Sequence, residues 1–165
     1  MRELLVLVAQ GFGVGRVPYA PGTFGTLLGF VLLGALLIPG SVLFFFFGLT
    51  AAVGVSILAC GQAEKALGKK DPASVVVDEI VAVPVCCLSW LLLEWRRFGA
   101  FPGVSDVFSA RRLWMLVAVF VLFRLFDIWK PWPVHGVQRF PGGWGVTADD
   151  LLAAGYVNLV IVWFV

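Results

Sequence analysis

The feature that most constrains the fold is a long apolar run, Phe24–Cys60, that contains no charged side chain. A helix needs about 20 apolar residues to cross the hydrocarbon core of a bilayer, so this run is longer than one crossing requires. It is interrupted only at Pro39-Gly40, and a Pro-Gly dipeptide is typical of a turn. The run therefore predicts a helical hairpin with arms Phe24–Ile38 and Ser41–Cys60, the first of which is short for a full span.

Three more apolar segments follow, and none alternates with the period of two that a β-barrel strand shows. They are Val75–Leu93, Leu113–Trp129 and Leu151–Val165. Of the 165 residues, 61% are hydrophobic and 13% are charged, against about 45–50% and about 25% in soluble domains. We therefore expect one domain over residues 1–165 with an all-α fold, an integral membrane helical bundle with about four to five apolar helices.

Charge and cysteine content exclude several classes of function. The formal net charge is only +2, and the basic residues are dispersed, which argues against nucleic acid as a partner. The cysteines Cys60, Cys86 and Cys87 lie in apolar runs and form no C-x-x-C pair, so neither a disulfide framework nor a zinc site is expected. No feature of the sequence specifies an oligomeric state.

Acidic side chains occur at three ends of the predicted spans: the start of the third, the end of the fourth and the approach to the fifth. If successive spans alternate in direction, these three ends lie on the same side of the membrane. The carboxylates are those of Asp78, Glu79, Asp127, Asp149 and Asp150. Two cations, Arg124 and Lys130, stand on either side of Asp127 in the sequence. The span count therefore predicts a cluster of five acids with cations beside them.

Basic residues indicate the orientation, because loops rich in lysine and arginine remain in the cytoplasm. Six basic residues fall in loops on the side of the acidic cluster, and four fall on the other side. The six are Arg16, Lys65, Lys69, Lys70, Lys130 and Arg139, and the four are Arg96, Arg97, Arg111 and Arg112. We expect the cluster on the cytoplasmic face of a multi-pass protein.

Ionisable residues at a membrane span suggest a function, because burying a charge there is costly. Interfacial snorkelling or structural ion pairing is the alternative explanation, and it suits one such residue better than five. Neighbouring carboxylates repel one another, and a divalent cation relieves that repulsion, with Mg²⁺ suited to oxygen ligands. The five carboxylates are therefore candidate catalytic residues and Mg²⁺ ligands, and Arg124 and Lys130 are candidates to bind a substrate phosphate.

The fourth span shows this combination on one helix, because Arg124, Asp127 and Lys130 recur at intervals of three residues. Pro131 lacks a backbone N–H, so it ends or kinks the helix and leaves the Asp127 carbonyl without its helical donor. A proline-terminated span with interfacial tryptophans is the alternative interpretation. That alternative accounts for the tryptophans but not for the aspartate.

Glycines mark two further segments. Gly142–Gly145 predicts a tight loop before the Asp149-Asp150 pair, whose structural role would be to cap the following helix. In the other segment, the backbone N–H groups around Pro21–Thr23 suit a phosphate, which makes Thr23 a third candidate phosphate-binding residue.

Missing motifs exclude three phosphatase chemistries. No cysteine has an arginine six residues later, and no Asp-x-Asp pair occurs. The first absence excludes a cysteine-phosphate loop. The second argues against an aspartyl-phosphate site of the haloacid type. The single histidine cannot supply the two that histidine-dependent lipid phosphatases need. What remains is a carboxylate-bound metal that polarises a phosphoryl group or activates water.

Four sequence blocks, in order over nearly the whole chain, carry a family resemblance. They are Pro21-Gly-Thr-Phe-Gly25, Val77-Asp-Glu79, Phe123-Arg-x-x-Asp-x-x-Lys-Pro-x-Pro133 and Gly142-Gly-x-Gly-x-x-x-Asp-Asp150. Together they resemble the phosphatidylglycerophosphatase A family of bacterial membrane lipid phosphatases. The resemblance implies Mg²⁺-dependent hydrolysis of phosphatidylglycerophosphate to phosphatidylglycerol and phosphate, a step of phospholipid biosynthesis, in the bacterial inner membrane.

The resemblance also implies which residues carry that activity. Residue by residue, it carries over Asp78, Glu79, Asp127, Asp149 and Asp150, with Arg124 and Lys130 beside them. Two alternatives stay open: a metal-dependent phosphatase that acts on another lipid phosphate, and a small membrane cation carrier. The cations beside the acids argue against a carrier and for an anionic ligand.

Overall fold

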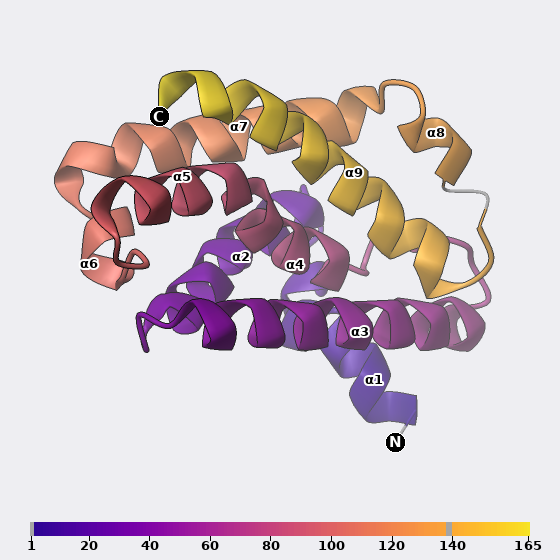
Figure 1. The fold of residues 1–165 in the computed structure, drawn as a ribbon. Coiled ribbons are helices and arrows are strands. Elements are labelled where there is room, and N and C mark those ends of the chain that lie inside the picture. Colours follow the sequence, from indigo (N-terminus) through magenta and orange to yellow (C-terminus); the bar gives the residue numbers. More distant parts are fainter. Residues whose placement is uncertain (1, 138–139) are drawn as a thin grey trace.

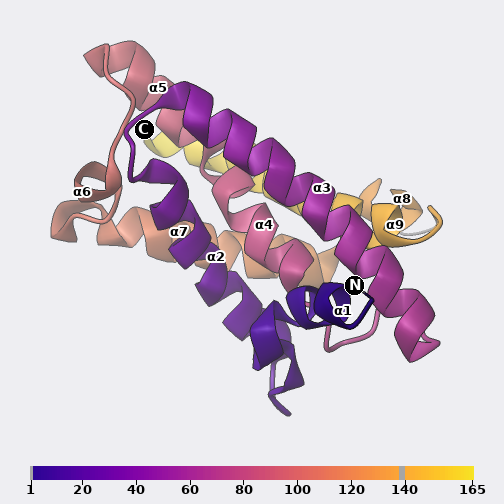
Figure 2. The ribbon, with the colours of Figure 1, turned by 90° about the horizontal axis from the view of Figure 1, so that it is seen from below.

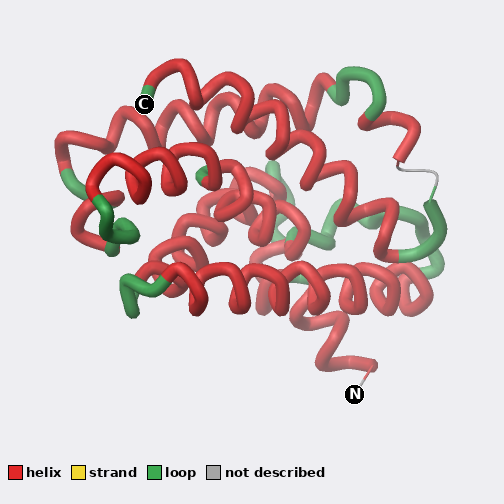
Figure 3. Tube along the Cα trace, in the orientation of Figure 1, coloured by secondary structure: helices red, strands yellow, loops and turns green. Residues whose placement is uncertain are grey.

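The computed structural model describes residues 2–137 and 140–165, so Arg139 lies outside the described residues. These residues form helices joined by short loops and contain no strand (Figures 1 and 3), which confirms the all-α prediction. The α-helices are α1 (Arg2–Ala9), α2 (Pro21–Leu37), α3 (Val42–Leu67), α4 (Val77–Cys86), α5 (Leu88–Phe98), α6 (Val104–Val107), α7 (Leu113–Trp129), α8 (Val134–Val137) and α9 (Gly143–Ile161). The 3₁₀ helices are η1 (Gly11–Arg16), η2 (Ala110–Arg112) and η3 (Val162–Phe164).

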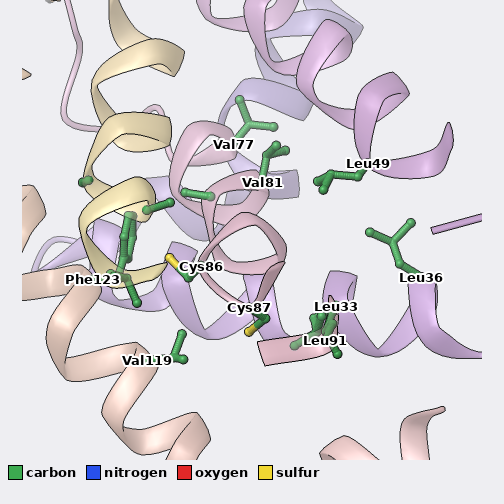
Figure 4. Packing of buried hydrophobic residues seen from close by; sticks show 14 of the residues in the cluster. Leu33, Leu36, Leu49, Val77, Val81, Cys86, Cys87, Leu91, Val119 and Phe123 are labelled. Atoms are coloured by element: carbon green, nitrogen blue, oxygen red, sulfur yellow. The ribbon is translucent and has the colours of Figure 1, made fainter. Parts of the chain in front are cut away.

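Helix α4 is the centre of the bundle. It contacts α2, α3, α7 and α9, and Figure 2 shows it in the angle between α2 and α3. Val77, Val81 and Cys86 of α4 are buried, and Figure 4 shows their side chains among buried residues of α2, α3 and α7. Because the first turn of α4 contains Asp78 and Glu79, this central position places two carboxylates inside the bundle.

The predicted turn between α2 and α3 is confirmed. Gly40 there has a φ of 59°, which glycine adopts without strain, and the Ser41 hydroxyl then accepts a hydrogen bond from an N–H in the first turn of α3. Helix α3 is 26 residues long and ends at Leu67, beyond the predicted end at Cys60. The extra turns are polar but rich in strong helix formers, so the end of the apolar run did not mark the end of the helix.

The prediction of one continuous third span, Val75–Leu93, is wrong, because the chain breaks at Cys87 into α4 and α5. The side-chain amide of Asn158, in α9, enters the helix at this break. Its Oδ1 accepts a hydrogen bond from the Ser89 N–H, and its Nδ2 donates one to the Val85 carbonyl, both at 2.7 Å. In a continuous helix these two backbone groups would bond to each other. The break is therefore stabilised by a residue distant in the sequence.

The last helix starts earlier than predicted, at Gly143 rather than Leu151. Asp149 and Asp150 consequently lie inside α9, in its second turn, and do not cap it. The predicted glycine loop is confirmed at Gly142, which precedes α9 with a φ of 63°, but not at Gly143 and Gly145, which lie in the helix. Gly143 lies so close to α3 that a Cβ there would strike the Ile57 carbonyl, so this glycine serves the packing of α9 against α3.

Fewer helices than predicted have the length of a membrane span. In the described part of the chain, two are long and apolar enough to cross a membrane: Val42–Leu67 and Gly143–Phe164. The prediction was four to five. The difference arises because α2 and α7 have 17 residues each and because the third predicted span is divided. Helix α7 nevertheless has its predicted bounds, Leu113–Trp129.

Candidate active site

Charged side chains from α4, the end of α7, α9 and one loop line a pocket of about 290 Å³. The pocket is formed by the start of α2, the loop before α4, the start of α4, the end of α7 and the second turn of α9. Its charged residues are Asp71, Asp78, Glu79, Arg124, Asp127, Lys130, Asp149 and Asp150. The structure thus brings together the five carboxylates and the two cations that were selected from the sequence.

Arg124 links α7 to α4 at the wall of the pocket. Its Nη1 lies 2.8 Å from Asp127 Oδ2, one turn later on the same helix, and 3.5 Å from Glu79 Oε1. The three side chains keep only 21%, 13% and 15% of their exposure, respectively. The contact with Asp127 is a charge-assisted hydrogen bond, which is stronger than a neutral one, and the contact with Glu79 is an ion pair. The guanidinium is therefore held between two carboxylates.

Lys130 links the end of α7 to α9. Its Nζ donates a hydrogen bond to Asp149 Oδ2 at 2.5 Å, and its backbone ends the helix in the left-handed conformation, directly before Pro131. Burial alone would lower the pKa of the Lys130 ammonium. The hydrogen bond to Asp149, together with the charges of Asp150 and Asp127, outweighs burial and raises that pKa above its usual value. Lys130 is therefore a permanent cation at this pocket at neutral pH.

Three carboxylates each carry a buried oxygen that makes no hydrogen bond within the described residues. These atoms are Asp78 Oδ1, Glu79 Oε2 and Asp150 Oδ2. Buried polar atoms are nearly always paired, and leaving one unpaired costs about 1–3 kcal/mol. All three residues line the pocket, so these oxygens mark positions for a cation or donor that the polypeptide does not supply.

Strained backbone conformations gather at the same pocket. Four non-glycine residues have a positive φ in the described part of the chain. Three of them line the pocket: Ala20 (47°), Asp71 (46°) and Lys130 (47°). Each such conformation costs about 1–3 kcal/mol and persists only where the surrounding structure enforces it, as it commonly does at functional sites. This backbone geometry supports a functional role for the pocket independently of its charge.

Asp71 is a pocket residue that the sequence analysis did not select. It is exposed, and its backbone N–H donates a hydrogen bond to Glu64 Oε1 of α3 at 3.0 Å, which fixes the loop. A signal for it was present in the sequence, because Asp71 follows Lys69 and Lys70 in the loop that the span count assigns to the side of the cluster. A carboxylate in a loop is usually a solvated surface charge, so its sequence position indicates a site less strongly than that of a carboxylate at a membrane span.

Thr23 is the one predicted site residue that the structure does not bring to the pocket lining. Helix α2 already begins at Pro21, and the Thr23 N–H donates to the Ala20 carbonyl at 2.9 Å, so it is not free to hold a phosphate. Gly22 faces the pocket instead. A Cβ at Gly22 would strike the Glu79 carboxylate, so glycine there lets α2 approach α4 closely.

The carboxylates have the oxygen ligands that Mg²⁺ prefers, but they do not form a complete coordination shell by themselves. Among the described residues, no group of three histidine, cysteine, aspartate or glutamate side chains is placed to hold one ion. Mg²⁺ in phosphoryl-transfer sites is commonly bound by one or two carboxylates, with water and substrate phosphate as the other ligands. The unpaired oxygens of Asp78, Glu79 and Asp150 therefore fit such an ion.

The fold and the pocket together define a class of protein. A mostly apolar helical bundle that gathers fixed cations and several carboxylates in one pocket has the features of an enzyme that acts on the phosphate of a lipid. The cations suit an anionic substrate, and the unpaired carboxylate oxygens suit a metal ion or the proton of a water molecule. The class is that of helical lipid phosphatases.

Comparison with known sequences gives the particular family. The sequence model of the family described as phosphatidylglycerophosphatase A matches residues 7–165. Two relatives named phosphatidylglycerophosphatase A are 33% identical (Escherichia coli, 96% of this chain and 81% of the relative) and 34% identical (Haemophilus influenzae, 94% and 85%). A Bacteroides thetaiotaomicron protein named "Putative phosphatidylinositol-3-phosphatase" is 39% identical over 96% of this chain and 91% of its own length. No solved structure matches. The chain belongs to the phosphatidylglycerophosphatase A family.

Proposed function

We propose that this protein is a phosphoric monoester hydrolase that removes the terminal phosphate of phosphatidylglycerophosphate and leaves phosphatidylglycerol. Family membership carries the choice of substrate. The observation that carries the chemistry is the pocket in which Arg124 and Lys130 stand among six carboxyl groups. A phosphomonoester needs cations to bind it and an acceptor for the proton of the attacking water, and this pocket holds both.

Each part of the pocket has a role in this proposal. Arg124 and Lys130 bind and orient the phosphate, and the carboxylates that hold them fix their positions. The unpaired oxygens of Asp78, Glu79 and Asp150 supply metal ligands and the acceptor for the water proton. Asp127 and Asp149 keep the two cations at the pocket wall. Gly22 allows α2 to close over Glu79.

Mg²⁺ dependence belongs to the same proposal. With all six carboxyl groups ionised, the pocket has six negative and two positive charges, an excess of four. A phosphomonoester is itself an anion, so it would be repelled without a further countercharge. When bound, Mg²⁺ supplies that countercharge and polarises the phosphoryl group. Asp78, Glu79 and Asp150 are candidate ligands through their unpaired oxygens, and Asp127 and Asp149 are candidates through the oxygen that each does not give to a cation.

We further infer that the protein is embedded in the bacterial inner membrane as a multi-pass protein with the pocket on the cytoplasmic face. Large apolar side chains are exposed along four helices, among them Val31 of α2, Phe47 of α3, Val121 of α7 and Leu159 of α9. Soluble monomers rarely expose apolar surface on this scale, whereas lipid would cover it. Labelling of single cysteines at positions 70 and 104 in intact spheroplasts tests the orientation, and equal labelling at both from outside would refute it.

The test of the function is phosphate release from phosphatidylglycerophosphate by the purified protein in mixed micelles. We expect release that stops in excess EDTA and returns with Mg²⁺. Release that continues in excess chelator would refute the metal proposal and leave the phosphatase proposal standing. No release with Mg²⁺ present would refute the phosphatase proposal and would favour the alternative of a cation carrier.

A second substrate follows from the name of the Bacteroides relative. Phosphatidylinositol-3-phosphate also carries a phosphomonoester, so Arg124 and Lys130 suit it equally well. The two lipids differ in the group beside that ester, glycerol in one and a bulky inositol ring in the other. Measuring kcat/KM for both lipids in the same micelles decides between them, and we expect the larger value for phosphatidylglycerophosphate.

A further inference from the structure

A second charged pocket lies at the other end of α7 and α9 from the acidic pocket. It is a cavity of about 350 Å³ between the end of α5, the start of α7 and η3. Figure 1 shows α5, α6 and the C-terminus gathered in this region, on the left of the view. Helix α7 has 17 residues, and a rise of 1.5 Å per residue places its two ends about 25 Å apart. The two pockets are therefore separate.

This second pocket is basic. Its charged side chains are Glu94, Arg97, Arg111 and Arg112, a surplus of two positive charges among the side chains, and Val165 also lines it. Glu94 is largely buried and lies 2.7 Å from Arg112. Arg97 and Arg111 are exposed, and neither has a carboxylate partner in the part of the chain that the structure describes. Two arginines are thus available to an anionic ligand.

Aromatic side chains surround these arginines. The Arg112 guanidinium, whose Nη1 forms the ion pair with Glu94, also lies 5.8 Å from the centre of the Trp90 ring, a cation–π contact. Trp114 and Phe164 lie edge to face, with their ring centres 6.4 Å apart. Tryptophan beside arginine at the end of an apolar helix is typical of the interface between membrane and water, where phospholipid headgroups lie.

An apolar groove of about 300 Å³ lies next to the basic pocket. Among the described residues, its lining consists of apolar side chains of α7, α9 and η3, and it shares Trp114 and Phe164 with the basic pocket. From there it extends along α7 past Ala118 to Val121. A charged cavity beside an apolar groove between two helices matches the form of a phospholipid, with a phosphate at one end and an acyl chain at the other.

We propose that the basic pocket and the groove together bind one anionic phospholipid, with its phosphate at Arg97 and Arg111 and one acyl chain between α7 and α9. An anionic headgroup offsets the surplus positive charge, whereas a zwitterionic headgroup brings an ammonium group that the same arginines repel. A free phosphate ion would satisfy the arginines and leave the groove uncovered. This site is separate from the acidic pocket, so it does not depend on the proposed catalytic function.

Native mass spectrometry of the detergent-purified protein tests this proposal with three probes: phosphatidylglycerol, phosphatidylcholine and inorganic phosphate. The test variant is Arg97→Gln with Arg111→Gln. Arg112 is left in place, because removing it would strand the buried Glu94 carboxylate. Arg96→Gln is the matched control, since Arg96 is an exposed arginine of α5 that does not line the pocket. We expect the double variant to bind phosphatidylglycerol at least about tenfold more weakly, and the control to bind it normally.

A second pair of variants tests the groove without changing any charge. Val121→Trp fills the groove, whereas Val117→Trp places the same side chain on α7 outside it. The two valines are similarly exposed, at 55% and 53%, so both variants should fold. We expect only Val121→Trp to weaken phosphatidylglycerol binding.

Three results would overturn the proposal. Equal binding of phosphatidylcholine would remove the preference for anionic headgroups. Unchanged phosphatidylglycerol binding by the double arginine variant would show that the lipid binds elsewhere, including at the acidic pocket. Inorganic phosphate that blocks the site, together with normal lipid binding by Val121→Trp, would identify a site for free anions.

Discussion

Replacing Asp127 by asparagine tests the candidate active site most directly, because it removes one charge and leaves the shape of the side chain. Asp127 accepts a hydrogen bond from Arg124 at 2.8 Å, but Arg124 also lies 3.5 Å from Glu79. The guanidinium therefore keeps one carboxylate partner, and we expect a loss of stability of only about 1–2 kcal/mol. A buried cation left with no partner would cost about 3–5 kcal/mol.

The expected loss of turnover is larger. If Asp127 positions Arg124 on the phosphate or binds Mg²⁺, turnover should fall by about 10²-fold, as it does for other groups that stabilise developing charge. A fall of that size corresponds to an increase of about 2.7 kcal/mol in the activation barrier. The assay measures phosphate release per folded molecule, together with the folded yield after purification. Asp106→Asn is the control, because Asp106 lies at the other end of the bundle and caps the Gly103 N–H there. Normal turnover with reduced yield would refute the reasoning and make Asp127 a structural residue.

Three further predictions concern residues that the structure singled out. Gly22→Ala should lower turnover about tenfold or more, because the added Cβ displaces the Glu79 carboxylate. Gly34→Ala is the control on the same helix, where a Cβ meets only ordinary contacts, and it should leave turnover unchanged. Equal turnover in the two variants would contradict this prediction. Asn158→Leu should lower the free energy of unfolding by about 2–4 kcal/mol, because two backbone groups lose their partners, and an unchanged denaturant midpoint would count against it. Asp71→Asn should raise the Mg²⁺ concentration for half-maximal activity about tenfold, because the pocket loses a negative charge, and a Mg²⁺ titration that matches the parent protein would place Asp71 outside the metal site.

Much of the fold could be predicted from the sequence, where local forces decide it. The bounds of α7, Leu113–Trp129, were predicted correctly, because an apolar run ends there at a cation followed by a proline that lacks an N–H. The turn at Gly40 follows equally from local chemistry. The convergence of five carboxylates could be predicted from the alternating direction of the apolar spans. The prediction holds although the third span is divided into α4 and α5 and although α9, the fifth predicted span, starts eight residues earlier than predicted. Neither error changed the end of the bundle at which the carboxylates meet.

Only the tertiary structure decided the features that depend on contacts between distant residues. The break at Cys87 uses Asn158 from another helix, and the partner of Lys130 is Asp149, which lies 19 positions later. The need for glycine at position 22 depends on the packing of α2 against Glu79. The position of Asp71 in the pocket lining depends on how its loop packs beside the start of α4. The physical reason is that sequence patterns report which surfaces are apolar and where helices end. They do not report which polar side chain crosses from one element to the next, because that depends on how the helices pack.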